Sequence, residues 1–287
     1  MVVSVTTSRA THLDDERKLQ ALEIDLLLTG VAERYGYDFR HYARASLTRR
    51  IRKAMQGEGV PSISALQSRL LHDIEAAMRF VAAVSVHTTS MYRDPEVYRV
   101  LRREVVPFLR TYPFVRIWHA GCSSGEEVYS LAILLEEEGL YDRCRIYATD
   151  ISDRILDVAR QGVFPLRSMR DHTRAYQAAG GVQDFSSYYL ADQENAVFRK
   201  SLRRQLVFSQ HNLVCDSVFN EFQLIVCRNV LLYFDQTLRQ RAQELFHSSL
   251  SNFGVLVLGK KESLRFTEQA ASYQELCDGS RVYRRVR

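Results

Sequence analysis

The sequence of 287 residues predicts an α/β fold that is preceded by an all-α domain and interrupted by a small antiparallel β-subdomain. From residue 115 onward, short runs of β-branched and aromatic residues alternate with segments of helical periodicity, which is typical of a parallel sheet. Residues 22–84 show helical periodicity broken by glycine and proline, which predicts three or four short helices. Between residues 163 and 210 the alternation stops, and we expect the inserted subdomain there.

Length and composition bound the class of protein. With 46% hydrophobic and 25% charged residues, the chain is typical of a globular protein with one large and one small domain. No apolar run approaches the roughly 18–20 residues that span a bilayer, and the first residues lack the pattern of a secretory signal. We therefore expect a cytoplasmic protein without membrane insertion. The five cysteines show no paired spacing, so neither a disulfide framework nor a metal site is expected.

These patterns divide the chain into three segments. Residues 1–20 are polar and are expected to be loosely ordered. A helical domain follows over residues 21–84, and residues 85–287 form the α/β domain into which residues 163–210 are inserted.

The helical domain contains a strongly basic stretch, RHYARASLTRRIRK, over residues 40–53. On a helix, Leu47 and Ile51 continue an apolar stripe that begins at Ala43. On another side, Arg49, Arg52 and Lys53 follow each other at helical spacing. A solvated helix face would show the same pattern, and so would a surface that docks on nucleic acid or on an anionic protein.

The elements of the larger domain follow in chain order. A helix over residues 74–84 links the two domains, and Pro95 starts a new helix after Asp94, its expected cap. Strands are predicted over residues 115–119, 145–149, 222–227, 253–258 and 282–286, and helices over residues 130–138, 155–159 and 236–250. In the insertion, residues 191–196 are expected to form the turn, followed by a second basic patch of Arg199, Lys200, Arg203 and Arg204.

A glycine turn between the first strand and its helix is the most informative motif. Gly121 and Gly125 punctuate this turn, which leaves unpaired backbone N–H groups at a helix N-terminus. Such groups would hold a pyrophosphate in a dinucleotide-binding fold. Here Glu126 and Glu127 follow at once, and two anions in contact repel by roughly 1 kcal/mol even in water. A cationic ligand is therefore favoured, although first-turn acids also simply complement a helix dipole.

A second acidic position follows one strand later. Asp150 comes directly after the strand at 145–149, at about the spacing where an acidic residue meets a ribose in a βαβ unit. S-adenosylmethionine has a ribose diol, a sulfonium and an ammonium but no phosphate, so this ligand suits both acidic positions. Cys122 lies in the turn without a nearby histidine in a recognisable arrangement, so we interpret it as a small packing residue rather than a nucleophile.

Several separated motifs then agree with one family. In order, TTSMYRD, WHAGCSSGEEVYSLA, YATDIS, FSQHNL and IVCRNVLLYFD resemble the S-adenosylmethionine-dependent chemotaxis receptor methyltransferases of the CheR type. The similarity starts near Leu22 and includes the basic helix ending in RRIRKAM. It implies an N-terminal helical domain and a Rossmann-like class I methyltransferase domain with an inserted β-subdomain. Family members methylate glutamate carboxylates on the helical bundle of a receptor and release S-adenosylhomocysteine.

The resemblance also implies roles for particular residues. Arg93 and Tyr233 would orient the acceptor carboxylate. Residues implied to bind the cofactor are His87, Thr89, Arg93, Gly121, Glu126, Asp150, Asn212, Leu213, Arg228 and Asn229. A carboxylate is already ionised at neutral pH, so the transfer needs positioning and removal of water rather than a general base. Arg93 could equally pair with Asp94 or Glu96 at the start of a helix, and Tyr233 could be a core aromatic.

The chain also departs from the family pattern at several positions. His87 replaces an asparagine, and Met91 and Tyr92 replace two phenylalanines before Arg93. Because a histidine changes its charge with pH, cofactor affinity could differ from the family norm. The remaining departures are Gln223, Lys260 and Lys261.

Three functions fit these observations to different degrees. The first is a protein-glutamate O-methyltransferase that acts on chemoreceptors, is monomeric, and docks through Arg49, Arg52 and Lys53. The second is a nucleic-acid methyltransferase, which the basic patches favour, but CRNVLLYF lacks the arrangement used on flipped base amines. The third is a non-catalytic S-adenosylmethionine-sensing module. Since Arg93 and Tyr233 are both present, we expect an active enzyme and no nucleic-acid partner.

Overall fold

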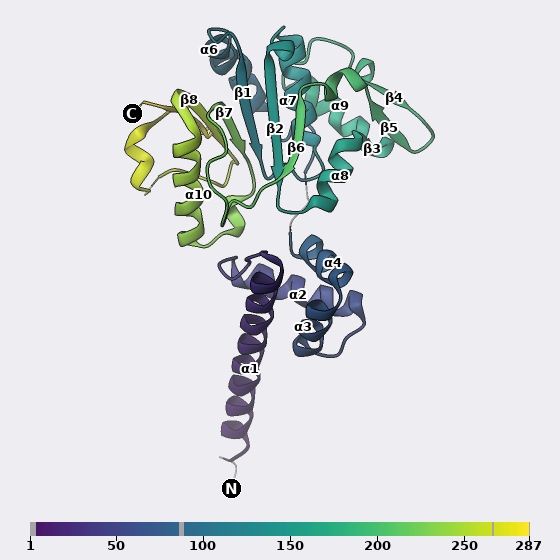
Figure 1. The fold of residues 1–287 in the computed structure, drawn as a ribbon, viewed down its shortest axis with the longest axis vertical. Coiled ribbons are helices and arrows are strands. Elements are labelled where there is room, and N and C mark those ends of the chain that lie inside the picture. Colours follow the sequence, from purple (N-terminus) through teal and green to yellow (C-terminus); the bar gives the residue numbers. More distant parts are fainter. Residues whose placement is uncertain (1–3, 86–88, 266, 287) are drawn as a thin grey trace. The chain divides into compact units, whose positions relative to one another are not determined.

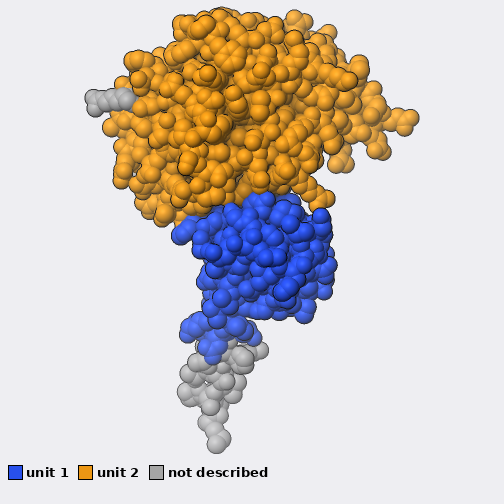
Figure 2. Space-filling view, in the orientation of Figure 1, with its two compact units in different colours: residues 1–86 blue, residues 87–287 orange. Residues whose placement is uncertain are grey.

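A computed structural model describes residues 4–85, 89–265 and 267–286 of the chain. The residues group into two compact units, 1–86 and 87–287, which Figure 2 shows in different colours. Each unit has its own core and is described by itself. Among the described residues, no helix combines the length and the apolar character that crossing a membrane would require.

The first unit consists of four helices: α1 (Ser4–Tyr35), α2 (Arg44–Glu58), α3 (Ile63–His72) and α4 (Ile74–Val84). Helix α1 packs on α3, and α2 packs on α4. Each of the last two helices begins with a side-chain cap. Ser62 Oγ accepts the Ala65 N–H at 3.1 Å before α3, and Asp73 Oδ1 accepts the Ala76 N–H at 3.1 Å before α4. The described core of this unit is apolar and includes Leu27, Leu28, Phe39, Leu66 and Phe80.

Helix α1 corrects the expectation that residues 1–20 are loosely ordered, since the helix begins at Ser4. No proline or glycine stands between Ser4 and Thr29, so nothing in the backbone interrupts a helix there. Polarity alone predicted disorder, but exposed polar residues also suit a solvated helix. Lys18 and Asp14, four positions apart, form an ion pair at 2.6 Å on its surface.

The second unit is built on a seven-stranded sheet with the order β6-β2-β1-β7-β8-β10-β9 (Figure 1). The first five of these strands are parallel, β10 pairs antiparallel with β8, and β9 pairs antiparallel with β10. The strands are β1 (Val115–Ala120), β2 (Cys144–Asp150), β6 (Leu206–Gln210), β7 (Phe222–Cys227), β8 (Leu250–Leu258), β9 (Tyr273–Glu275) and β10 (Val282–Arg285). The chain moves from β1 outward to β2 and β6 and then returns to β7, so the strand order reverses beside β1. In open parallel sheets, ligands bind at such a reversal, outside the carboxyl ends of the strands.

Helices connect and cover these strands, and most of the predicted elements are present. All six residues of β7 are buried, as expected for a strand that is covered on both faces. The helices of this unit are α5 (Pro95–Val100), a π turn (Leu101–Val105), α6 (Val106–Leu109), α7 (Glu126–Glu137), α8 (Asp153–Gln161), α9 (Met169–Ala178) and α10 (Gln236–Ser249). Short 3-10 turns lie at Tyr141–Arg143, Leu166–Ser168, Phe185–Tyr188, Lys200–Arg203, Leu231–Tyr233 and Glu268–Ser272.

The inserted subdomain is a three-stranded antiparallel sheet with the order β3-β5-β4, accompanied by α9. Its strands are β3 (Val163–Pro165), β4 (Tyr189–Ala191) and β5 (Asn195–Phe198). Asp192 closes the β4–β5 turn without a glycine, because its Oδ1 accepts the N–H groups of Glu194 at 2.9 Å and Asn195 at 2.7 Å.

The insertion ends earlier than residue 210. Strand β6 pairs in parallel with β2 and therefore belongs to the main sheet. Its side chains are half-buried or exposed because it is an edge strand. Its sequence therefore lacks the continuous apolar run that is typical of a buried parallel strand. Strand β9, three residues long, was not predicted either.

Candidate functional site

The glycine turn after β1 touches the turn after β7. Gly121 and Gly125 have φ values of +71° and +95°, a region that favours glycine. A Cβ atom on Gly121 would lie 2.4 Å from Val230 Cγ2, so a side chain there would force the two turns apart. The Cys122 N–H donates to the Thr149 carbonyl at 2.9 Å and so joins the same turn to β2. Burial raises the pKa of the Cys122 thiol well above its usual range, which supports a packing role.

Asp150, at the end of β2, binds the glycine turn directly. Its Oδ2 accepts the Ser123 N–H at 2.9 Å, and its Oδ1 accepts the Ser152 N–H at 3.1 Å. The carboxylate is mostly buried and therefore has a fixed orientation. An ionised carboxylate held in this way at the end of the second strand suits the hydroxyls of a ribose.

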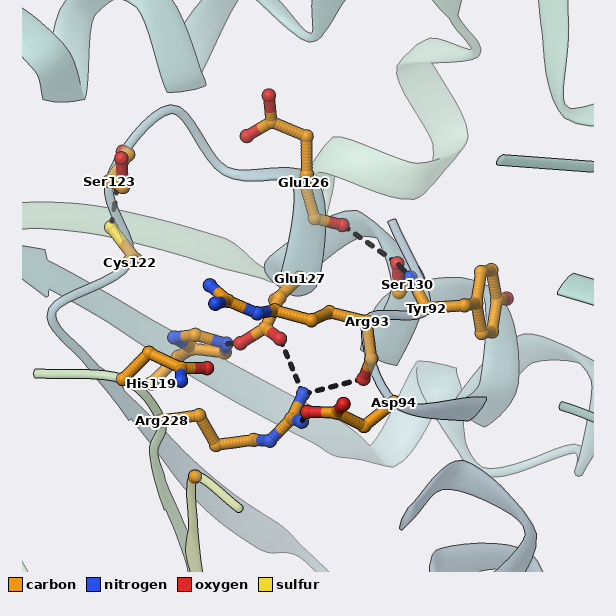
Figure 3. Close-up of polar contacts among 12 residues, drawn as sticks. Tyr92, Arg93, Asp94, His119, Cys122, Ser123, Glu126, Glu127, Ser130 and Arg228 are labelled. Atoms are coloured by element: carbon orange, nitrogen blue, oxygen red, sulfur yellow. Dashed lines mark hydrogen bonds and ion pairs between the residues drawn. The ribbon is translucent and has the colours of Figure 1, made fainter. Parts of the chain in front are cut away.

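Glu126 and Glu127 point in different directions, although the sequence placed both carboxylates at the ligand. Figure 3 shows Glu126 turned away from Arg228 and Glu127 turned toward it. Glu126 is half-buried and accepts the Ser124 hydroxyl at 2.6 Å, and burial raises its pKa. Glu127 is buried. Of the two, only Glu126 keeps an exposed portion that suits a cationic ligand.

Arg228 is the centre of a buried ion cluster beneath the turn. Its side chain is only 2% exposed and pairs with Glu127 through Nη1 and with Asp94 Oδ2 through Nη2, the latter at 2.6 Å. Nη1 also donates to the Arg93 carbonyl at 2.9 Å. In Figure 3 the Arg93 side chain lies across Glu127. The family resemblance implied that Arg228 binds the cofactor; in the structure its guanidinium holds the segment that carries Arg93.

His119, on β1, lies beside this cluster. Its Nε2 is 3.8 Å from Glu127 Oε2, and within the described parts of the chain neither ring nitrogen has a hydrogen-bond partner. Burial, together with the nearby Arg228 cation, lowers its pKa to about 3, so the ring is neutral at pH 7. His119, Glu127 and Arg228 line a cavity of about 10 Å³ together with apolar side chains of α5 and β8. This volume is close to the smallest space that holds one water molecule.

Because His119 is buried and neutral, it makes the folded protein less stable as the pH falls. In the unfolded chain its pKa is near 6.5, so below that pH the unfolded state binds a proton that the folded state excludes, and stability is lost as the pH falls toward 3. Between about pH 7.5 and pH 5 this loss amounts to about 2 kcal/mol, from roughly 1.4 kcal/mol per pH unit below 6.5. Urea unfolding of the wild type and of His119→Gln at both pH values measures it.

The His119→Gln variant is the control that isolates this effect. Burial raises the pKa values of Glu126, Glu127 and Glu262, and those shifts act in the opposite direction in both proteins. We therefore expect the wild type to lose about 2 kcal/mol more than the variant. Equal losses in the two proteins would contradict a neutral, buried His119.

The segment before α5 is held in an unusual conformation. Tyr92 and Asp94 have φ values of 51° and 53°, and the Tyr92 N–H donates to Ser130 Oγ at 3.0 Å. The Tyr92 ring is fully buried against Tyr98 and Tyr176. Met91 and Tyr92, the departures from the family pattern, are thus core residues. Thr89 is half-buried, and His87 lies outside the described residues.

Asn212 and Leu213 follow β6 and are both mostly buried. The Asn212 side chain shapes its own turn, because Oδ1 accepts the Val214 N–H at 2.9 Å. Asp216 Oδ2 accepts the Asn212 N–H at 2.7 Å, so the turn presents a fixed backbone. This turn is joined to the end of β2 because the His211 N–H donates to the Asp150 carbonyl at 3.1 Å.

Glu262, which the sequence did not single out as a site residue, organises the turn after β7. Its buried carboxylate accepts the N–H groups of Gly259 at 2.6 Å, Asn229 at 3.0 Å and Leu232 at 3.3 Å. Asn229 has a φ of 60°, and Tyr233 is half-buried in the short turn that follows. In the sequence, its place directly after Lys260 and Lys261, which depart from the family pattern, was the signal that could have drawn attention to it.

The predicted site residues that the structure describes therefore gather at the carboxyl ends of β1, β2, β6 and β7 and in the segment before α5. An acidic site beside the reversal of strand order, with a glycine turn after the first strand, is typical of Rossmann-like folds, which include the class I methyltransferases that use S-adenosylmethionine. Residues 87–278 match the family described as CheR methyltransferase, SAM binding domain, and residues 22–85 match CheR methyltransferase, all-alpha domain. The chain belongs to the CheR methyltransferase family.

Relatives of nearly full length support this assignment. A Pseudomonas putida KT2440 protein provisionally named methyltransferase Cher3 is 47% identical over 264 residues, which cover 92% of this chain and 97% of the relative. A chemotaxis protein methyltransferase of Listeria innocua is 30% identical, covering 85% of this chain and 91% of its own. The Listeria monocytogenes protein of the same name is 31% identical with the same coverage.

Proposed function

We propose that this protein transfers the methyl group of S-adenosylmethionine to glutamate side chains of chemoreceptors and forms glutamyl methyl esters. The observation that carries the proposal is the buried cluster of Arg228, Glu127 and Asp94, which fixes the segment carrying Arg93 beside the acidic glycine turn. Relatives named chemotaxis protein methyltransferase support the receptor as the acceptor. Release of S-adenosylhomocysteine would accompany each transfer.

Different residues at the carboxyl edge of the sheet would bind different parts of the cofactor. Asp150 would accept hydrogen bonds from the ribose, and Glu126 would attract the ammonium of the methionine part. When bound, the cofactor supplies an electrophilic methyl group on a sulfonium. The residues that would line the remainder of its site are His87, Thr89, Gly121, Asn212, Leu213 and Asn229, with Arg228 beneath them.

The acceptor carboxylate needs orientation rather than activation. It is ionised at neutral pH, so no general base has to remove a proton. Arg93 would hold it through a forked guanidinium, and the Tyr233 hydroxyl would add one hydrogen bond. An interaction that bound the ground state too tightly would slow the attack, so positioning and exclusion of water are the main contributions of the protein.

Incubation with methyl-labelled S-adenosylmethionine and the cytoplasmic fragment of a chemoreceptor tests the proposal. We expect label on glutamate side chains that is released as methanol in mild alkali, as a carboxyl ester requires. Label on nucleic acid would favour a nucleic-acid methyltransferase instead. Cofactor binding without transfer to any receptor fragment would favour a sensing module. Either of these results would contradict the proposal.

Helix α2 offers a surface for the acidic receptor. Leu47, Ile51 and Ala54 bury one side of the helix. Arg49, Arg52 and Lys53 are exposed on the other side and line a surface groove together with Arg44, Thr48 and Gln56. We propose that this face docks on the anionic helical bundle of the receptor while the enzyme acts as a monomer in the cytoplasm.

Reversing the charges of Arg49, Arg52 and Lys53 to glutamate tests this docking. We expect kcat/KM for the receptor fragment to fall by about tenfold or more, which corresponds to about 1.4 kcal/mol, because attraction becomes repulsion. The effect should shrink at high salt. Calorimetry should show unchanged affinity for S-adenosylmethionine, since these residues belong to the helical unit. Unchanged receptor methylation would exclude this face as the docking surface.

A further inference from the structure

The loop after β8 presents two lysines from a fixed backbone. Lys260 and Lys261 follow Gly259, and both side chains are exposed. The next residue, Glu262, is buried and accepts backbone N–H groups from Gly259, Asn229 and Leu232. The two ammonium groups therefore extend from a loop that is tied to the turn after β7.

Contacts place this loop between the two segments that carry the proposed acceptor-binding residues. Lys260 Nζ lies 3.5 Å from Glu96 Oε1 at the start of α5, three residues after Arg93. On the other side, a Cβ atom on Gly259 would be 2.7 Å from the Asn229 N atom, so the two backbones touch. Asn229 begins the turn that leads to Tyr233. The lysines therefore lie between the Arg93 segment and the Tyr233 turn.

The stability of the fold does not explain the two lysines. The Lys260–Glu96 pair is exposed, with side-chain exposures of 70% and 53%, and an exposed pair contributes little to stability. Within the described parts of the chain, Lys261 makes no hydrogen bond or ion pair. Arg281 adds a further cation, since its Nε donates to the Lys260 carbonyl at 3.5 Å. The buried Glu262 carboxylate is occupied by backbone donors, so the exposed charge of this loop is positive.

We propose that Lys260 and Lys261 bind acidic residues that flank the methyl-accepting glutamate, and so make the enzyme select acceptors in acidic sequence. This inference rests on the proposed function. On a helical acceptor, carboxylates three or four positions from the methylated glutamate lie on the same face, where both lysines can reach them. The contact is separate from α2, because it belongs to the unit that contains the reaction site. It adds to receptor binding beside the reaction site and ranks acceptors by their charge.

The double variant Lys260→Glu/Lys261→Glu tests the proposal against a matched control, Arg167→Glu/Arg170→Glu. The control reverses two exposed cations on the inserted subdomain. With a receptor fragment as substrate, we expect KM of the lysine variant to rise by about tenfold, with kcat changed by less than about twofold, because docking rather than methyl transfer is affected. The control should retain the wild-type KM, and Lys260→Arg/Lys261→Arg should restore it.

A second substrate makes the test specific. In this receptor fragment, the acidic residues that flank the accepting glutamate are replaced by glutamine. We expect the wild type to show a smaller increase in KM on this fragment, because attraction is lost without repulsion. The KM of the lysine variant should instead fall on this fragment, because the acidic residues that repel its glutamates are gone. Cofactor affinity by calorimetry and the unfolding midpoint should match those of the wild type and so exclude misfolding.

The outcomes separate this inference from the proposed function. If the wild type methylates no receptor glutamate, the proposed function fails. If the wild type does methylate and the lysine variant keeps the same KM, the lysines are not a docking pair. If KM increased equally in the lysine variant and in the control, the effect would come from the net charge of the protein. That result would also overturn the proposal.

Discussion

Replacing Arg228 with methionine is expected to lower the free energy of unfolding by about 3–5 kcal/mol, the usual cost of removing one partner of a buried ion cluster. The change leaves the buried carboxylate of Glu127 without its cation and removes the partner of Asp94. It also frees the Arg93 carbonyl, so methylation should be lost together with stability. Urea unfolding followed by circular dichroism measures the first effect, and the receptor assay measures the second.

Two further variants control for the loss of a positive charge and of side-chain volume. Arg239→Met removes an exposed arginine whose Nε donates to the Phe234 carbonyl at 2.9 Å, and it should change stability by less than about 1 kcal/mol. Arg228→Lys keeps the charge but cannot donate from two nitrogens to separate acids, so we expect an intermediate stability. A fully stable and active Arg228→Met variant would show that the cluster does not position Arg93.

Replacing Asp150 with alanine is expected to weaken the binding of S-adenosylmethionine and S-adenosylhomocysteine by about 100-fold or more, or about 2.7 kcal/mol. The carboxylate would accept the ribose hydroxyls, and it also holds the glycine turn through Ser123. Both contributions are lost in the variant. Calorimetric titration of both ligands into the folded protein measures the change.

Asp153→Ala is the matched control for the Asp150 variant. Asp153 is an exposed aspartate that begins α8 three residues later, and its removal should leave the affinity within about threefold of the wild type, since distant surface changes act weakly. Asp150→Asn should retain the fold better than alanine while losing the charge. Equal affinities of the wild type and the Asp150→Ala variant would remove Asp150 from the proposed ribose site.

The central strands and the glycine turn could be predicted because local chemistry determines them. Strand β7 must be apolar along its whole length to be buried on both faces, and its observed ends coincide with the predicted residues 222–227. Gly121 and Gly125 are needed for positive φ values, so the turn is visible in the sequence. The small antiparallel sheet was also indicated by its β-branched runs.

The ion cluster could not be predicted in the same way. Glu127 and Arg228 are 101 residues apart in sequence, and only the pairing of β1 with β7 brings them together. Neighbouring residues on a helix are rotated by about 100°, so Glu126 and Glu127 could not both face one ligand. The different directions of these two carboxylates therefore follow from the sequence alone. The prediction for edge strand β6 failed for a different reason. Several of its residues are exposed, so its sequence lacks the continuous apolar run of a buried parallel strand.

The carboxylate of Glu262 has a consequence for any attempt to redesign the acceptor preference of this protein. One carboxylate accepts the N–H groups of Gly259, Asn229 and Leu232, so the turns after β7 and β8 are rigidly connected to each other. A sequence change that reshapes one turn therefore displaces the other. Under the proposed function, a chimera designed to change the acceptor would therefore need both turns of one relative, because a single exchanged turn would not fit the Glu262 carboxylate and the turn that remains.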